Sequence, residues 1–301
     1  MSGTHSPTVR GRRLALELRR LREAAKLTCE DVAVRLECSA SKISRIETGR
    51  VSVSPRDVRD LLRIYDVPED QHDSLIQLAR QSRQKGWWHS YGPGVQPQLA
   101  TYLGMESAAS EIRFYSVARI PALLQTENYA RAVIAAGRLG NSYPVPTDWP
   151  VELLMERQRL AMASPPHLWV IMDEAALRRQ VGGRETTRLQ IEHLIELSSM
   201  PTVFLQLIPF SRGEYAAMDL PFNILGFPDQ ADPDVACAGY PTGLLWIEDA
   251  AEVDRYNLIF HHLQAVALSP AESVALMVAT LKEQHADADG PPPRMARISC
   301  A

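Results

Sequence analysis

The sequence has little cysteine and no long hydrophobic run, and both absences restrict the class of protein. The 301 residues include four cysteines, none spaced as in a C-x-x-C zinc motif: Cys29, Cys38, Cys237 and Cys300. Free thiols are therefore the default. No apolar run approaches the roughly 18 residues that a membrane-spanning helix needs, and the polar N-terminus lacks the apolar core of a signal peptide. We therefore expect a cytoplasmic protein that does not enter a membrane.

Motifs for catalysis are also lacking, since the sequence contains no P-loop, dinucleotide fingerprint, G-x-S-x-G elbow or H-E-x-x-H zinc motif. The densest charged cluster joins Asp173-Glu174 with Arg178-Arg179. Acids at a helix start, paired with arginines one turn later, explain it better than paired acid catalysis. His261-His262 lie on an expected helix, where adjacent side chains point about 100° apart and do not readily share a metal ion. We expect no enzymatic activity, no metal and no cofactor.

The small net charge of -4 divides unevenly along the chain. Residues 1–85 contain 17 Lys and Arg against 12 Asp and Glu, a net charge of +5. Residues 86–301 contain 15 against 24, a net charge of -9. A positive N-terminal segment is typical of a surface that meets the phosphates of nucleic acid.

The stretch from residue 28 to residue 49 is typical of two short helices joined by a tight turn. Thr28 is a suitable N-cap for the first helix, and the acids Glu30 and Asp31 favour the positive helix start. The apolar face of this helix consists of Val32, Ala33 and Leu36. After a polar turn, Ser39 is a second N-cap, and Ile43 and Ile46 repeat at helical spacing before the terminating Gly49.

Because the isoleucines are expected to face the core, small and cationic side chains remain on the exposed face and at the N-terminal end of the second helix. A recognition helix needs such residues, because its first turns enter the major groove. Arg45 and Lys42 are expected to contact bases or phosphates, and Thr28 to hold the first helix against the DNA backbone. The predicted DNA-binding residues are Thr28, Ser39, Ala40, Ser41, Lys42, Arg45 and Arg50.

This stretch resembles the helix-turn-helix of the lambda-repressor or Xre type. In that family a Ser-x-Ile-x-x-Ile-Glu-x-Gly pattern recurs, and the matching residues are Ser41, Ile43, Ile46, Glu47 and Gly49. The resemblance implies a five-helix domain over residues 10–85 that binds an operator in double-stranded DNA as a homodimer. Its first helix, residues 11–25, carries leucines at helical spacing and five arginines, of which we expect two to contact phosphates: Arg12, Arg13, Arg19, Arg20 and Arg22.

The composition changes at residue 86, where aromatic and turn-forming residues replace periodic ones. We interpret residues 86–98 as a connector docked on the second domain, because a flexible linker is rich in Gly and Ser. Trp87 and Trp88 either fill core there or line a ligand cavity. The second domain spans residues 99–285, and the Pro-rich tail 286–301 is expected to be disordered.

The second domain combines helices with short strands. Helices are expected at 102–112, 126–131, around Arg157, 173–181, 184–199, 249–268 and 270–285, with an extended segment at 113–120. Strands rich in Val, Phe and Ile are expected at 167–172, 202–209, 222–227, 235–240 and 244–248. The fold class is therefore α+β, with an N-terminal all-α five-helix lambda-repressor-like domain and a C-terminal domain of helices and a small, mainly antiparallel sheet.

Several separated segments of the second domain, in order, are similar to a pattern found in helix-turn-helix regulators of filamentous actinomycetes. The first runs from Ile120 to Ala130, the second from Asp173 to Gly183, and shorter ones are Leu207-Ile208-Pro209-Phe210 and Pro221-Phe222. Ala122 departs from the pattern, since a glycine is usual after the proline. The resemblance implies a transcription regulator of the toxin-antitoxin-like or developmental type, often encoded near a small partner protein, whose C-terminal domain has no established function.

The sequence thus predicts a sequence-specific DNA-binding transcription regulator, associated with the nucleoid, whose C-terminal domain senses an apolar small molecule or docks a partner protein. The residues expected to enclose the small molecule are Trp87, Trp88, Tyr91, Leu124, Tyr129, Tyr215, Met218, Phe222 and Trp246. The alternative is an antitoxin-like interaction module with autoregulatory DNA binding and no small-molecule ligand. The operator, the sign of regulation, the effector and the domain that carries the dimer interface are not indicated.

Overall fold

The computed structural model describes residues 9–49, 51–83, 86–137, 148–229, 232–240 and 243–286. The chain forms two compact units. One consists of residues 1–112, 160–166 and 223–256, and the other of residues 113–159, 167–222 and 257–301. The segments 1–8 and 138–147 and nearly all of the expected tail lie outside the described residues.

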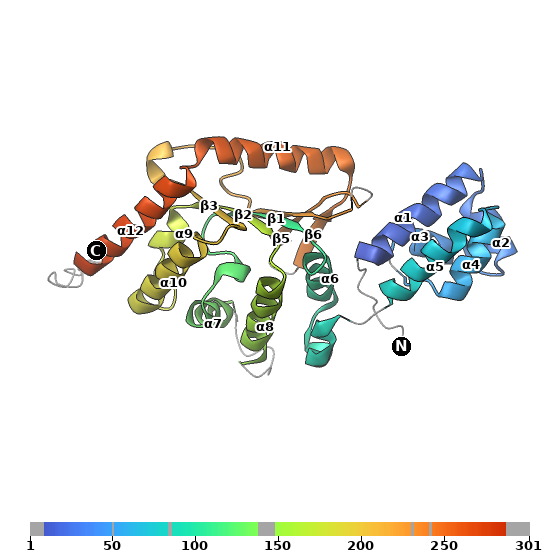
Figure 1. The fold of residues 1–301 in the computed structure, drawn as a ribbon, viewed down its shortest axis with the longest axis horizontal. Coiled ribbons are helices and arrows are strands. Elements are labelled where there is room, and N and C mark those ends of the chain that lie inside the picture. Colours follow the sequence, from blue (N-terminus) through green and yellow to red (C-terminus); the bar gives the residue numbers. More distant parts are fainter. Residues whose placement is uncertain are drawn as a thin grey trace, which may run out of the picture. The chain divides into compact units, whose positions relative to one another are not determined.

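The N-terminal region consists of five helices around one apolar core (Figure 1). They are α1 (Val9–Ala24), α2 (Cys29–Arg35), α3 (Ala40–Glu47), α4 (Pro55–Ile64) and α5 (Glu69–Ser82). The expected apolar faces of α2 and α3 lie in this core, since Val32, Ala33, Ile43 and Ile46 are buried and Leu36 is partly buried. The other buried residues include Leu14 and Leu18 of α1 and Val58, Leu61 and Leu62 of α4. On α5, Ile76 and Ala79 are buried, whereas Leu75 and Leu78 are only partly buried.

Left-handed backbone conformations end the two motif helices. Gly49, with φ 66°, follows α3, where glycine adopts this conformation without a steric cost. Glu37, with φ 52°, makes the turn between α2 and α3. A non-glycine residue in this region is strained by contact between its Cβ and the backbone. The turn therefore has its expected position but carries a residue that is not the best one for it.

The aromatic connector is a 3-10 segment, η1 (Trp87–Gly94), followed by α6 (Pro97–Glu106). Trp88 is 5 % exposed. It packs so closely on two glycines that an added Cβ would lie 2.2 Å from its ring at Gly86 and 3.3 Å at Gly104 on α6. The packing of Trp88 therefore supports the interpretation that this side chain fills core.

The expected helix at 102–112 is wrong in its last residues. The α6 helix ends at Glu106, and Glu111 and Ile112 belong to the first strand. The Ser107 hydroxyl donates to the Leu103 carbonyl at 2.7 Å, in competition with the backbone ladder. The Ser110 N–H then donates to the Gly226 carbonyl at 2.9 Å, which starts the strand.

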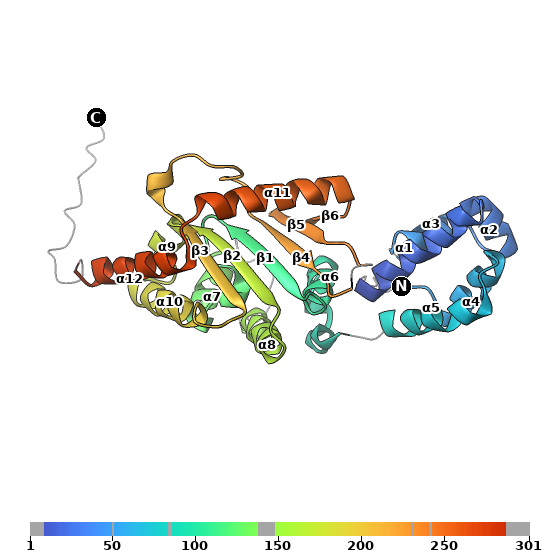
Figure 2. The same ribbon diagram turned by 45° about the horizontal axis from the view of Figure 1, so that its top comes forward.

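Six strands form one mixed sheet in the order β3-β2-β1-β4-β5-β6 (Figure 2). β2 and β3 run parallel, with Trp169 opposite Phe204, whereas β5 and β6 run antiparallel. The α+β fold class is confirmed, and each expected strand is present. The strands are β1 (Glu111–Ser116), β2 (His167–Asp173), β3 (Val203–Ile208), β4 (Phe222–Gly226), β5 (Val235–Tyr240) and β6 (Gly243–Ile247).

Helices cover both faces of the part of the sheet formed by β1, β2 and β3. Figure 1 shows α7, α8 and α10 on one side of these strands and α11 on the other. The remaining elements are η2 (Ala122–Leu124), α7 (Glu127–Ala136), α8 (Trp149–Ala163), α9 (Ala175–Arg178), α10 (Arg184–Leu197), η3 (Phe210–Arg212), α11 (Ala250–Val266) and α12 (Pro270–Ala286). Across the described ranges, no single helix is long and apolar enough to cross a membrane. The consecutive pair α11 and α12 passes that test together but is bent by 64°.

Candidate nucleic-acid interface

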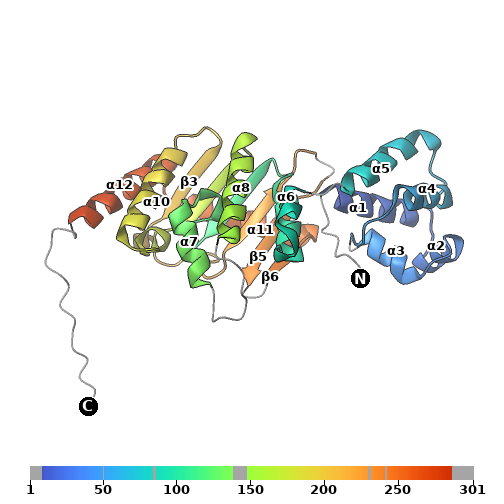
Figure 3. The same cartoon turned by 90° about the horizontal axis from the view of Figure 1, so that it is seen from below.

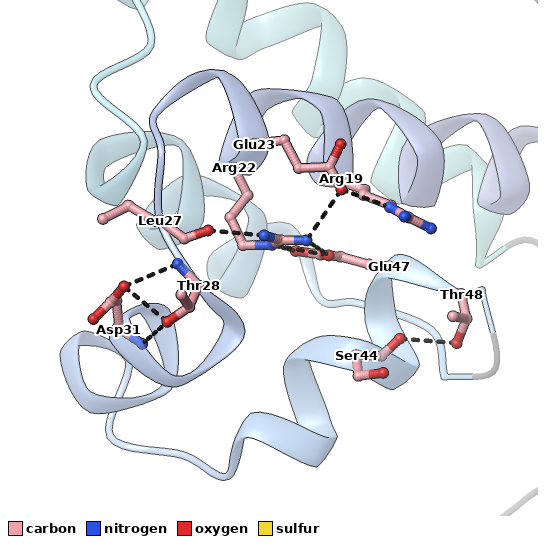
Figure 4. Close-up of polar contacts among 9 residues, drawn as sticks. All are labelled: Arg19, Arg22, Glu23, Leu27, Thr28, Asp31, Ser44, Glu47 and Thr48. Carbon is pink, nitrogen blue, oxygen red and sulfur yellow. Dashed lines mark hydrogen bonds and ion pairs between the residues drawn. The ribbon is translucent and has the colours of Figure 1, made fainter.

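Both helices of the motif begin with a side-chain cap. Thr28 Oγ1 accepts a hydrogen bond from the Asp31 N–H at 3.1 Å, and the Asp31 carboxylate accepts from the Thr28 N–H at 2.9 Å (Figure 4). This reciprocal pair is a capping box. Hydrogen bonds from the Thr28 backbone and hydroxyl hold the pKa of Asp31 below its ordinary value. Ser39 Oγ accepts from the Lys42 N–H at 3.2 Å, so both expected N-caps are confirmed.

A buried ion pair fastens α3 to α1. The Arg22 guanidinium donates to the Glu47 carboxylate from Nε at 2.8 and 3.0 Å and from Nη2 at 2.8 Å, and Nη1 donates to the Leu27 carbonyl at 2.8 Å (Figure 4). The exposed side-chain fractions are 12 % for Arg22 and 4 % for Glu47. The hydrogen bonds to Glu47 raise the pKa of Arg22 above its ordinary value. The pair fixes the orientation of α3, so its outer face is presented in one direction.

The outer face of α3 is a stripe of exposed polar residues with one cation. Ser41, Ser44, Arg45 and Thr48 are exposed and follow one another at i, i+3, i+4 and i+7, which places them along one side of the helix. Arg45 Nε donates to the Ser41 carbonyl at 3.1 Å. Within the described residues no carboxylate pairs with Arg45, so its guanidinium is available to an external acceptor.

The other predicted residues of this interface differ in availability. Lys42 is half-buried, and its Nζ lies 3.5 Å from the Asp57 carboxylate, which partly neutralises it. Ser39 is exposed and Ala40 is half-buried. Arg50 lies outside the described residues. The geometry therefore favours Arg45 over Lys42 as the residue that reads bases, and the predicted contacts to DNA stay predictions.

Ser44 and Thr48 were missed as members of the outer face. The spacing from Ser41 by three and seven residues was the signal that would have found them. The Thr48 hydroxyl donates to the Ser44 carbonyl at 2.8 Å, so it also closes the last turn of the helix (Figure 4). The serines and the threonine are short enough to let the backbone of α3 approach a groove closely.

The arginines of α1 divide into inward and outward groups. Arg12 and Arg22 are nearly buried, so neither is free to meet a phosphate. Arg19 and Arg20 are exposed by 57 % and 66 % and make only local ion pairs, with Glu23 and Glu17. Exposed pairs of this kind contribute little energy and exchange readily for a phosphate. These two arginines are the phosphate candidates on α1.

The aromatic residues predicted to bind a ligand fall into separate clusters. In the first unit, Trp87 makes edge contacts with Trp88 and Tyr91, with ring centroids 5.9 and 6.2 Å away. Trp246 lies 6.2 Å from Tyr102. Each ring thus has an aromatic neighbour, and Trp88 and Tyr102 are buried whereas Trp87, Tyr91 and Trp246 are half-buried.

In the second unit, Leu124 and Tyr129 are fully buried, and Met218 is half-exposed. Tyr215 donates to an Asp173 carboxylate oxygen at 2.6 Å and accepts from the Tyr115 hydroxyl at 3.3 Å. Burial raises the pKa of Tyr115 to about 12. Phe222 packs on Tyr115, with ring centroids 5.5 Å apart. Ligand binding by the nine predicted residues stays a prediction.

The capped helix pair, the oriented α3 and its polar face define a helix-turn-helix protein of the DNA-binding class. Comparison with family models agrees, because residues 13–75 match a helix-turn-helix domain. Residues 99–278 match a domain of unknown function (DUF5753). That match covers more than half of the chain, so the chain belongs to the DUF5753 family. No curated protein and no solved structure matches the chain.

Proposed function

We propose that this protein is a sequence-specific transcription regulator of the lambda-repressor or Xre type, from the regulator family of filamentous actinomycetes. The observation that carries the proposal is the outer face of α3. Arg45 stands there among short hydroxyl side chains, on a helix held by a Ser39 cap and by the pair of Arg22 with Glu47. An arginine on an oriented helix is suited to a bidentate contact with guanine in the major groove.

The small DNA-contacting surface of a single five-helix domain favours a homodimer. One five-helix domain covers a short half-site, and specific affinity in this class usually comes from two half-sites about one helical turn of DNA apart. We therefore propose that the protein binds a double-stranded operator as a homodimer, in the cytoplasm where the nucleoid lies. A monomer in sedimentation at micromolar concentration, with and without DNA, would contradict this part of the proposal.

The C-terminal domain is proposed to sense a small molecule or to dock a partner protein, and not to catalyse a reaction. Its densest charged cluster has structural duties that support this. Asp173 accepts hydrogen bonds from the Ala175 N–H and the Tyr215 hydroxyl, and Glu174 pairs with Arg178. The alternative proposal is an antitoxin-like module that binds a partner protein and represses its own gene without a small-molecule ligand.

The test is fluorescence anisotropy on the DNA upstream of the protein's own gene, against scrambled DNA, over a series of salt concentrations. Loss of a bidentate base contact costs about 1–3 kcal/mol, so Arg45→Ala should weaken binding to the specific DNA by roughly 5- to 150-fold. Arg45→Lys keeps the charge but not the planar fork, so it should lose preference while it keeps most of the salt-dependent binding.

The matched control is Arg80→Ala on α5. Figure 3 shows α5 on the other side of α1 from α3, and Arg80 is an exposed arginine of the same domain. Arg80→Ala removes the same charge as Arg45→Ala, so a purely electrostatic mechanism predicts an equal loss of DNA affinity for the two variants. Equal losses, or equal affinity of the wild type for both DNAs at every salt concentration, would count against sequence-specific recognition by α3.

A further inference from the structure

A groove of about 410 Å³ opens in the second unit, between the start of α7 and the last turns of α10. Its volume lies within the range of about 300–1,000 Å³ that is usual for binding sites. The α7 side consists of Thr126, Glu127 and Asn128. The α10 side presents Leu189, Glu192, His193 and Glu196. None of the residues predicted to bind a ligand lines it.

The two walls of the groove are fixed to each other by a buried side chain. Gln190 on α10 is fully buried. Its amide nitrogen donates to the Leu124 carbonyl at 2.7 Å, and its oxygen accepts from the Thr126 N–H at 2.6 Å. The start of α7 is thereby held against α10. A groove with rigid walls loses little conformational entropy when it binds, which favours affinity.

The charge around the groove is negative. Glu127 pairs with Arg131, and Glu192 pairs with Arg188. Glu196 lies near His193, with Nδ1 3.9 Å from the carboxylate, and it is 80 % exposed. Asp148 and Glu185 also contact the two arginines, so four carboxylates pair with two guanidinium groups, and Glu196 adds a fifth carboxylate.

The dipole of α10 adds to this field. Glu192 and Glu196 lie in its last two turns, where the helix end carries a partial negative charge, and its last turn contains no basic residue. The cation that would complement this end is therefore not supplied by α10 itself. Apolar surface lies one turn earlier, because Leu189 lines the groove and is 39 % exposed.

We propose that this groove docks a basic segment of a partner protein. A lysine or arginine of the partner lies between Glu192 and Glu196, and an aliphatic side chain of the same segment covers Leu189. Charge complementarity identifies the cation, and the exposed leucine beside it identifies a peptide side chain in preference to a free polyamine. The proposal rests on the proposed function, since docking here is how a partner would act on the regulator.

The test uses the full-length protein and a short fluorescein-labelled peptide that contains arginine and leucine among glycine and serine. Glu192→Gln with Glu196→Gln removes one half-buried and one exposed charge and keeps the side-chain shapes. Exposed ion pairs are individually weak, so affinity should fall by about 2- to 30-fold. The matched control, Glu214→Gln with Asp219→Asn in the exposed loop before β4, removes two charges outside the groove and should bind as the wild type does.

Three results would overturn docking at this groove. The first is unchanged affinity in the Glu192→Gln, Glu196→Gln protein, and the second is an equal loss in the control protein. The third is full displacement of the peptide by spermidine, together with unchanged affinity of a peptide in which serine replaces leucine, which would indicate a polyamine site. The DNA readout is separate: Arg45→Ala should keep peptide binding, so failure of DNA recognition and failure of docking are distinguishable.

Discussion

The ion pair between Arg22 and Glu47 is the contact on which the orientation of the recognition helix depends. Glu47→Gln keeps the shape of the side chain but removes the charge that Arg22 faces across three hydrogen bonds. The guanidinium then remains nearly buried, with the exposed Glu23 carboxylate, 3.6 Å away, as its remaining counter-ion. We expect the helix-turn-helix domain to lose a large part of its stability and α3 to lose its fixed direction.

The magnitude follows from the burial of the pair. Removal of one partner from a buried ion pair costs about 3–5 kcal/mol. Arg22 keeps 12 % exposure and its bond to the Leu27 carbonyl, so we expect about 2–4 kcal/mol, toward the lower part of that range. A domain of this size has an m value of about 1 kcal/mol/M in urea, so the midpoint should fall by about 2–4 M.

The assay separates the two domains by their fluorescence. All five tryptophans lie outside the helix-turn-helix domain: Trp87, Trp88, Trp149, Trp169 and Trp246. Trp149 and Trp169 lie in the second compact unit, whereas Trp87, Trp88 and Trp246 share the first unit with the helix-turn-helix. Emission from a protein that keeps Trp149 and Trp169 and carries phenylalanine at the other three positions therefore follows the second unit, whereas circular dichroism at 222 nm follows the helices of both. Urea titrations should show the dichroism transition of Glu47→Gln at lower urea, with the tryptophan transition unchanged.

Two further variants decide whether the reasoning is right. Glu23→Gln removes an exposed carboxylate 3.6 Å from the same guanidinium, and should cost less than about 0.5 kcal/mol. The double replacement Arg22→Met with Glu47→Leu leaves no buried charge and should recover much of the lost stability. A shift below about 0.5 M for Glu47→Gln, or an equal shift for Glu23→Gln, would refute the account.

Three other predictions concern single contacts. Thr28→Val should destabilise the helix-turn-helix domain by about 1 kcal/mol through loss of the N-cap, and should raise the pKa of Asp31 measured by NMR. Because folding lowers that pKa, the wild-type contribution is present above the unfolded pKa and disappears as pH falls through the folded one. Glu37→Gly should stabilise the same domain by up to about 1 kcal/mol in urea titrations. Gln190→Leu leaves two backbone groups unpaired and should lower the free energy of unfolding measured by tryptophan fluorescence by about 2–5 kcal/mol. The surface variant Gln180→Leu should leave that free energy unchanged.

Local sequence patterns predicted the elements well because each element meets its own requirement. The cap at Ser39 and the isoleucines of α3 suffice to place a helix, since both act within one or two turns. The same holds for β2, where a run of apolar residues between turn formers predicts a buried strand. The end of α6 was misplaced because Ser107 competes for a backbone carbonyl, a choice that apolar periodicity does not register.

Contacts between distant residues were not predictable in the same way. Arg22 resembles the solvated arginines beside it, and only the fold brings it to Glu47, which lies 25 residues away. Gln190 lies on an ordinary amphipathic helix, yet it bonds the Leu124 carbonyl 66 residues earlier. The groove between α7 and α10 depends on that bond. From the sequence alone, the acidic residues of the groove are interpreted as solvated helix positions. Only the fold shows that they lie beside α7.

The run from Ile120 to Ala130 positions α7 beside the groove, although most of its residues do not line that groove. The Ile120 carbonyl accepts from Gln125, and the Ile120 N–H donates to the Tyr129 hydroxyl. Gln158 donates to the carbonyls of Ala122 and Gln125. These backbone groups of the segment are therefore satisfied inside the domain, although the buried Thr126 hydroxyl has no hydrogen-bond partner among the described residues, and the bonds hold the start of α7 in place.

The residues of this motif and the side chains of the groove have different functions. Most of the motif residues are fixed by internal bonds, so they position α7 and the groove without contacting a partner. The groove side chain Glu192 pairs with Arg188 on the same helix, and Glu196 lies 3.9 Å from His193, so their contacts are local to α10 and do not hold the run from Ile120 to Ala130 in place. Gln158→Leu should therefore weaken peptide binding through displacement of α7, and it should also lower stability, whereas Glu196→Gln should weaken binding alone. Equal stability loss in both variants would show that the acidic side chains belong to the fold and not to the docking surface.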